Sequence, residues 1–334
     1  MKAEAAAYRP KDVLHLWWLQ DPAHPRAIGE LRLVLGGRGV GLHYAAEWLR
    51  SGFPLSEDLP LADELFVPAQ KDTVAGAVDD ARPDRWGERV IRRFEPSPRL
   101  SLMEFLLFAG DDRYGALGVS ESPGSYQPWP SAPVPTLASL AQMADAVRRI
   151  LANEPVPELQ RRLLRPGVSL GGARPKSLVM IDGEPWLVKF SEGEDLDTEL
   201  VEHATMTLAG TCGIILVDNT DDHEKNHALL RQADGAWLLA PAFDVLPSAQ
   251  GLGAQALIVG DAGAEADLHN ALSQARAFGL KAAAAREIVR QVARKVQGWK
   301  DHFRAVGVRA ADIDVLAQYI DGERLGGQRR AFAS

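Results

Sequence analysis

The segment from residue 218 to residue 226 is the most informative part of this sequence. It reads Asp-Asn-Thr-Asp-Asp-His-Glu-Lys-Asn, so four residues separate Asp221 from Asn226. A further carboxylate, Asp244, follows Phe243 and lies eighteen residues after the asparagine. In protein kinases this spacing belongs to the catalytic loop, where the aspartate accepts a hydroxyl proton and the asparagine binds Mg²⁺. The pattern therefore predicts that Asp221 is a general base and that Asn226 and Asp244 bind Mg²⁺.

The same segment allows a second interpretation. His223 and His227, with Glu224 after the first, match the H-E-x-x-H motif of zinc hydrolases, and Asp244 could supply a third ligand. That motif requires both histidines on one face of a helix, whereas residues 219–222 are typical of a turn or a helix start. A zinc hydrolase therefore remains an alternative. In a third interpretation, an aspartate of this turn caps an ordinary helix.

Composition indicates a globular protein without a secretion signal. The 334 residues suffice for two or three subdomains, and 46% of them are hydrophobic. The net charge of −8 argues against a protein that coats nucleic acid. A lone cysteine, Cys212, excludes a disulfide within the chain and fits a reducing cytoplasm. No stretch approaches the roughly 20 apolar residues of a membrane span, so we expect a cytoplasmic protein with no membrane partner.

The first 136 residues predict an N-terminal subdomain followed by a linker. Short apolar runs and glycine turns predict strands, and longer periodic runs predict helices. The expected strands cover 13–19, 31–35 and 116–119, the expected helices cover 84–95 and 100–108, and 44–49 could be either. Residues 121–136 contain five prolines among serine and glycine, which is typical of a linker. We therefore place the subdomain at 1–120.

The remaining sequence predicts two lobes, a smaller one at 137–214 and a helical one at 215–334. In the smaller lobe, helices are followed by a glycine turn and by a hairpin whose strands are joined at Asp182-Gly183. The expected helices of both lobes cover 137–153, 156–164, 197–209, 280–303 and 310–320.

The glycine turn and the hairpin could bind a nucleotide phosphate. Gly171 and Gly172 allow backbone N–H groups to approach an anion closely. Lys189, on the return strand, is placed to reach a phosphate, and Glu202 or Glu199 on the next helix would orient it. Taken singly, these residues could be a plain turn, a solvent-facing lysine and surface charges. Their order along the chain, followed by the Asp-x₄-Asn loop and a metal-binding aspartate, is that of a kinase.

With these segments the chain resembles the HipA family, bacterial serine/threonine kinases that act as toxins of type II toxin–antitoxin modules. The resemblance covers about residue 12 to about residue 300. The combination of Asn-Thr-Asp-x-His-x-x-Asn with Pro-x-Phe-Asp is its most specific part. The segments that carry it are 54–56, 83–87, 112–118, 171–176, 188–190, 219–227 and 240–244.

The resemblance implies an α+β, two-lobed protein-kinase-like fold with an additional N-terminal subdomain, and ATP and Mg²⁺ as cofactors. By motif position, Asp221 matches the catalytic base, Asn226 and Asp244 the metal ligands, and Lys189 the phosphate-binding lysine. Ser169 matches the serine that family members phosphorylate on themselves, which ejects the phosphate loop and silences the kinase. An ordinary turn serine is the alternative for this position.

The resemblance also implies partners that these residues do not themselves reveal. Family members pair with a small helix-turn-helix antitoxin, HipB, and reach operator DNA only through it. Their studied substrates include an aminoacyl-tRNA synthetase, whose phosphorylation stops translation and arrests growth.

One region departs from the family pattern. A kinase needs a hinge for adenine and about two helices before its catalytic loop, yet here the preceding helix ends near Gly210, eleven residues before Asp221. Residues missing from the sequence around 210–218, an artificial deletion or a natural truncation would each explain this. A Cα spacing well above about 3.8 Å would indicate missing residues. A natural truncation would weaken or abolish ATP binding and leave a pseudokinase that still binds the antitoxin.

Overall fold

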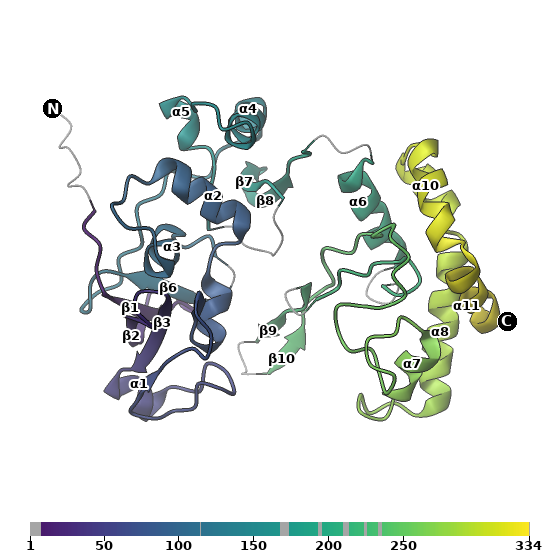
Figure 1. The fold of residues 1–334 in the computed structure, drawn as a ribbon, viewed down its shortest axis with the longest axis horizontal. Coiled ribbons are helices and arrows are strands. Elements are labelled where there is room, and N and C mark those ends of the chain that lie inside the picture. Colours follow the sequence, from purple (N-terminus) through teal and green to yellow (C-terminus); the bar gives the residue numbers. More distant parts are fainter. Residues whose placement is uncertain are drawn as a thin grey trace. The chain divides into compact units, whose positions relative to one another are not determined.

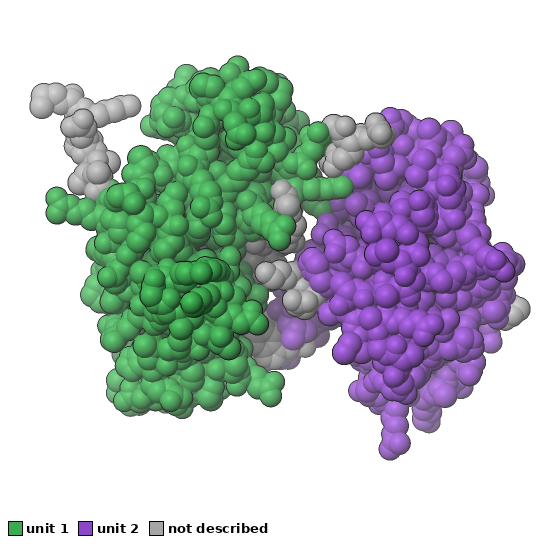
Figure 2. All heavy atoms as spheres, in the orientation of Figure 1, with its two compact units in different colours: residues 1–192 green, residues 193–334 purple. Residues whose placement is uncertain are grey.

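The computed structural model describes two compact units, residues 1–192 and 193–334 (Figure 1, Figure 2). The described residues are 8–113, 115–167, 174–192, 196–209, 214–223, 226–232 and 236–333. Several predictions therefore lie outside the described residues, namely those for Ser169, Gly171, Gly172, Glu224 and the junction at 210–213.

The first unit is built on a six-stranded sheet with the order β4-β3-β2-β1-β6, in which β5 pairs with β3. Only the β3–β5 pair is parallel. Gly36 and Gly37, with φ of 68° and 87°, make the turn between β2 and β3, a conformation that glycine adopts without strain. The strands are β1 (Val13–Trp18), β2 (Arg26–Val34), β3 (Gly39–Tyr44), β4 (Leu65–Phe66), β5 (Thr73–Val74) and β6 (Leu117–Ser120).

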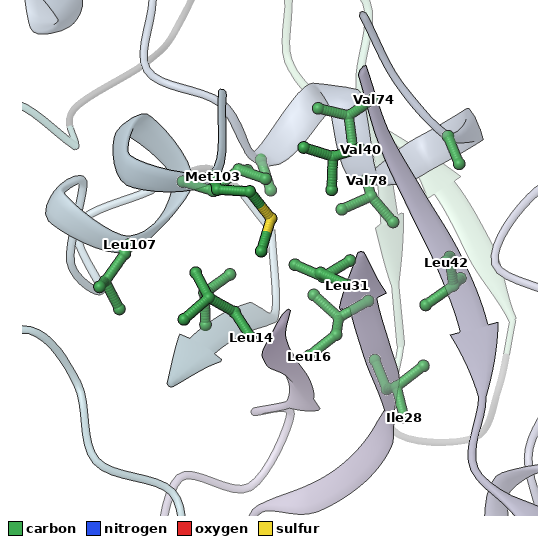
Figure 3. Close-up of a cluster of buried hydrophobic side chains, with 14 of the residues drawn as sticks. Leu14, Leu16, Ile28, Leu31, Val40, Leu42, Val74, Val78, Met103 and Leu107 are labelled. Atoms are coloured by element: carbon green, nitrogen blue, oxygen red, sulfur yellow. The ribbon is translucent and has the colours of Figure 1, made fainter. Parts of the chain in front are cut away.

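Alternating apolar side chains place the core of the first unit on one face of this sheet. Leu14 and Leu16 of β1 are fully buried, as the two-residue period of a strand requires. They meet Met103 and Leu107 of helix α3 (Leu102–Phe108), as Figure 3 shows. Ser101 begins this helix with a capping box that it forms with Glu104.

The rest of the first unit packs mainly on helix α2. Trp86, Val90 and Ile91 form its buried face. The first two contact Met143 and Ile150 of α4 in a second core. Residues 121–135, predicted as a linker, contain neither helix nor strand, and Trp129 of this segment packs against the core of the first unit. The remaining elements are α1 (Ala46–Ser51), η1 (Gly76–Ala81), α2 (Arg85–Phe94), η2 (Leu137–Ser139), α4 (Leu140–Leu151), α5 (Glu158–Arg161), β7 (Lys176–Ile181) and β8 (Glu184–Lys189).

The second unit is mainly helical. The prediction of one helix over 280–303 is wrong. Gly298 separates two helices there, α8 (Ala282–Gln297) and α9 (Trp299–Val306). The spacing of Ile288, Val292, Val296 and Trp299 predicts one buried stripe. Ile288 is nevertheless 41% exposed, because α8 packs mainly through its C-terminal half. Among the described helices, none combines the length and apolar character needed to cross a membrane. The elements are α6 (Thr198–Ala209), β9 (Leu229–Arg231), β10 (Trp237–Leu239), α7 (Leu268–Ser273), α8 (Ala282–Gln297), α9 (Trp299–Val306), α10 (Ala310–Ile320) and α11 (Glu323–Ala333).

Candidate functional site

The Asp-rich loop is anchored by the apolar residues before it. Leu216 and Val217 are buried in a cluster with Val245, which directly follows Asp244. The loop then turns back, because the backbone N–H of Asn219 donates to the carbonyl oxygen of Ile214 at 3.1 Å. Apolar burial thus fixes where the polar residues begin, and it ties this loop to the segment that carries Asp244.

The three aspartates of the loop differ in their surroundings. Asp218 is 1% exposed and binds Arg324, and Asp222 is 9% exposed and binds His227 at 3.0 Å. Asp221 is exposed, and its carboxylate makes no hydrogen bond or ion pair with any residue that the structure describes. A carboxylate with free lone pairs can accept a proton, so the structure distinguishes Asp221 from its two neighbours.

Asn226 is folded back on Asp221. Its Nδ2 atom donates to the backbone carbonyl oxygen of Asp221 at 3.3 Å, and its backbone N–H donates to His223 at 2.9 Å. The side chain is 4% exposed, yet Oδ1 has no hydrogen-bond partner among the described residues. A buried carbonyl oxygen without a partner is costly, and an asparagine of the kinase catalytic loop binds Mg²⁺. Asn226 therefore fits the role of a magnesium ligand.

The hairpin of β9 and β10 connects Asn226 with Asp244. Leu229 pairs with Leu239, and the backbone N–H of Ala240 donates to the carbonyl oxygen of Ala228 at 2.8 Å, which extends the pairing toward both residues. Asp244 has a φ of 58°, a conformation that is uncommon outside glycine. Backbone strain of this kind is concentrated at functional sites.

The zinc motif lacks the setting that it requires. Residues 219–223 are not helical, and Nε2 of His227 is engaged by Asp222. The Nδ1 atom of His223 is buried without a partner in the described chain. Among the residues that the structure describes, no group of three or more His, Cys, Asp or Glu side chains is arranged to hold a metal. The two predicted Mg²⁺ ligands, Asn226 and Asp244, include only one carboxylate. Phosphate oxygens and water usually supply the other ligands of such a site.

The predicted phosphate-binding residues divide between the two units. Lys189 ends β8 in the first unit, where the ladder pairs it with Lys176, the first residue of β7. Glu202 is 9% exposed on α6 in the second unit, and the side chain of Glu199 lies outside the description. The predicted hairpin is confirmed, because Asp182 and Gly183 both have positive φ at its turn.

Sequence reasoning missed a buried ion pair between Lys176 and Asp84. Lys176 Nζ lies 2.6 Å from Asp84 Oδ2, and the two side chains are 2% and 6% exposed. The other oxygen of Asp84 accepts from the backbone of Gly87 at 2.8 Å and caps α2, while Trp86 Nε1 donates to the carbonyl oxygen of Lys176. Burial raises the pKa of the Asp84 carboxyl, and the ammonium group of Lys176 opposes this rise. Asp84 and Lys176 both lie in segments that carry the family resemblance, 83–87 and 171–176. This was the only feature of the sequence that could have drawn attention to the two residues.

The chain on either side of residues 168–173 is held by further contacts. Arg165 forms a partly buried ion pair with Asp112, and its backbone N–H donates to Oγ of Ser177 at 3.1 Å. Gly167 lies so close to the main chain that a Cβ atom there would be 2.0 Å from the carbonyl oxygen of Ala109. Together with Lys176, these contacts fix both ends of the segment that contains the glycine turn.

Gly87 allows α2 to approach this segment, and alanine at this position is expected to destabilise the protein. A Cβ atom would lie 2.2 Å from the carbonyl oxygen of Pro166. Overpacking of this kind costs about 1–3 kcal/mol, which outweighs the roughly 1 kcal/mol that alanine usually gains over glycine within a helix. Urea unfolding will measure the change.

The matched control is Gly327→Ala in α11, where nothing lies within 4 Å of the Cβ position. This variant should gain up to about 1 kcal/mol. An equal gain for Gly87→Ala would contradict the close approach of α2 to Pro166.

Two protein-family models match this chain. A model of the HipA N-terminal domain matches residues 23–120, and a model of the HipA-like C-terminal domain matches residues 214–299. Together the two matches span more than half of this mixed α/β chain. The match to the C-terminal domain contains the Asp-x₄-Asn loop. The chain belongs to the HipA family, the toxins of toxin–antitoxin systems.

A solved structure agrees with this assignment at the level of the fold. It is the complex of HipA, HipB and operator DNA from the Shewanella oneidensis MR-1 toxin–antitoxin system, with a TM-score of 0.55 and 15% sequence identity. The match covers 96% of this chain and 99% of the other. No curated protein matches the chain significantly.

Proposed function

We propose that this protein is an ATP- and Mg²⁺-dependent serine/threonine protein kinase and the toxin of a bacterial toxin–antitoxin module. The observation that carries the proposal is the pair formed by Asp221 and Asn226. The first presents a carboxylate without a partner in the described chain, and the second presents a buried amide oxygen without one. The proposal assigns the first as a base and the second as a metal ligand, because their spacing is the one that kinases use.

In this mechanism Asp221 accepts the proton of a serine or threonine hydroxyl on the substrate protein. The hydroxyl oxygen bonds to the γ-phosphorus, and the bond from that phosphorus to the β–γ bridging oxygen breaks, so that ADP leaves with the electron pair. Asn226 and Asp244 would hold Mg²⁺, which neutralises charge on the phosphates. Lys189 and the N–H groups of Gly171 and Gly172 are proposed to bind phosphate oxygens of the nucleotide.

The partners and the regulation are part of the same proposal. A helix-turn-helix antitoxin related to HipB is the proposed partner, supported by the similarity to a HipA–HipB–DNA complex. Operator DNA would be reached through it. The proposed substrate is a translation component in the cytoplasm, such as an aminoacyl-tRNA synthetase. Its phosphorylation would stop translation and arrest growth. Phosphorylation of Ser169 is the proposed self-inactivation.

A second candidate is a pseudokinase that binds the antitoxin without transferring phosphate. It is favoured by the short connection between α6, which ends at Ala209, and the loop that begins at Ile214, where the match to the C-terminal family model also begins. A hinge for adenine has no room in so few residues. The two candidates differ in whether the protein binds ATP.

Titration with ATP, with and without Mg²⁺, separates the two candidates. We expect Mg²⁺-dependent binding that Asn226→Ala weakens by at least about tenfold, since even outer-shell partners of metals contribute that much. Asn226→Asp, which keeps an oxygen ligand, should retain more of the binding. Retained antitoxin binding without any nucleotide binding would instead establish the pseudokinase.

A further inference from the structure

A buried carboxylate lies three residues before the proposed base. Asp218 is 1% exposed and has a φ of 62°, so the chain accepts both backbone strain and the burial of a charge at this position. Such a charge requires partners within hydrogen-bond distance. The backbone N–H of Gly251 donates to Oδ2 at 3.1 Å, and Nη2 of Arg324 donates to Oδ1 at 3.3 Å.

The arginine comes from the first turn of α11, 106 residues further along the chain. Its Nη1 atom also donates to the carbonyl oxygen of Ala266 at 3.1 Å. Gln328, one turn later, donates to the same carbonyl at 3.4 Å and accepts from the backbone N–H of Leu268 at 2.9 Å. One face of α11 thus binds both Asp218 and residues 266–268.

Ser248 links the backbone of Asp218 with that of Thr220 through two hydrogen bonds. The carbonyl oxygen of Asp218 accepts from the backbone N–H of Ser248 at 2.8 Å, and the hydroxyl of Ser248 accepts from the backbone N–H of Thr220 at 2.8 Å. Ser248 follows Asp244 by four residues, and Thr220 precedes Asp221. The two bonds therefore join the segment of the proposed base to the segment of a proposed metal ligand.

We infer that Arg324 is a positioning residue, which fixes the loop of Asp221 by holding the carboxylate of Asp218 from α11. This inference rests on the proposed kinase function. Phosphoryl transfer depends almost entirely on positioning and charge, and a displacement of about 1 Å can cost about a hundredfold in rate. Arg324 itself does not touch the reacting atoms and acts through Asp218.

The test compares Arg324→Ala and Arg324→Lys with Arg330→Ala. Arg330 is exposed on the same helix and makes no ion pair with a described residue. We expect Arg324→Ala to lower kcat by about ten- to a hundredfold, with a KM for ATP that changes less than about threefold. Arg324→Lys should recover part of kcat because it restores the charge, and Arg330→Ala should match the wild type.

Amide hydrogen exchange of the peptide 214–223 supplies a readout that does not depend on activity. It should be about tenfold faster in Arg324→Ala than in Arg330→Ala, because the loop opens more often. Equal exchange and equal kcat in these two variants would overturn the inference while leaving the kinase intact. A wild-type protein that transfers no phosphate would overturn the proposed function, and the exchange comparison would still decide whether Arg324 holds the loop.

Discussion

Replacing Asp221 with alanine is expected to lower the rate of phosphoryl transfer by about 10²–10⁴-fold, the contribution typical of a general base. The physical reason is that the substrate hydroxyl would lose its proton acceptor. Because the carboxylate of Asp221 is exposed and has no partner in the described chain, its removal breaks no described hydrogen bond. The free energy of unfolding should therefore change by less than about 0.5 kcal/mol. Transfer of labelled γ-phosphate and urea unfolding measure the two quantities.

The control variants are chosen from the same unit. Asp314→Ala removes an exposed carboxylate from α10 and should leave both quantities unchanged. Asp221→Asn keeps the size of the side chain but cannot accept the proton, so it should be nearly as inactive as Asp221→Ala. Phosphate transfer that survives in both Asp221 variants would show that another group is the base.

Replacing Lys176 with methionine is expected to lower the free energy of unfolding by about 3–5 kcal/mol, the usual effect of removing one partner of a buried ion pair. The carboxylate of Asp84 would be left buried and unpaired next to the first turn of α2. Lys71→Met, at an exposed position of the same unit, is the matched control and should have little effect. Urea unfolding measures both variants.

The double variant Asp84→Asn, Lys176→Met separates the charge from the packing. Asparagine still caps α2 but carries no charge, so the double variant should recover part of the stability that Lys176→Met loses. The single variant Asp84→Asn completes the comparison. If its loss of stability simply adds to that of Lys176→Met in the double variant, the two residues do not interact.

Local sequence patterns predicted much of the fold. The apolar run of β1 and the Asp182-Gly183 turn each act within a few residues, so their signals are legible in the sequence. The position of the break between α8 and α9 was missed. The apolar period continues from Val292 and Val296 to Trp299, and a glycine within such a pattern lowers helix stability without marking a definite end.

The site was predictable only where its residues are close in sequence. Their spacing placed Asp221 and Asn226 in one candidate site, and the structure shows a hydrogen bond from the Asn226 side chain to the backbone of Asp221. The pair of Asp84 and Lys176 spans 92 residues, and the pair of Asp218 and Arg324 spans 106. Such contacts arise from the packing of distant elements, and no local period encodes which lysine or arginine will be buried.

The bond between the backbone of Arg165 and the hydroxyl of Ser177 has a consequence for the length of the chain between these residues. Arg165 precedes residues 168–173 and Ser177 follows them, and two ion pairs lie beside this bond, Arg165 with Asp112 and Lys176 with Asp84. The entropy of closing a loop there grows only slowly, by about 0.6 kcal/mol for each doubling of its length. Changes in the length of the chain between these two residues should therefore cost the first unit little stability.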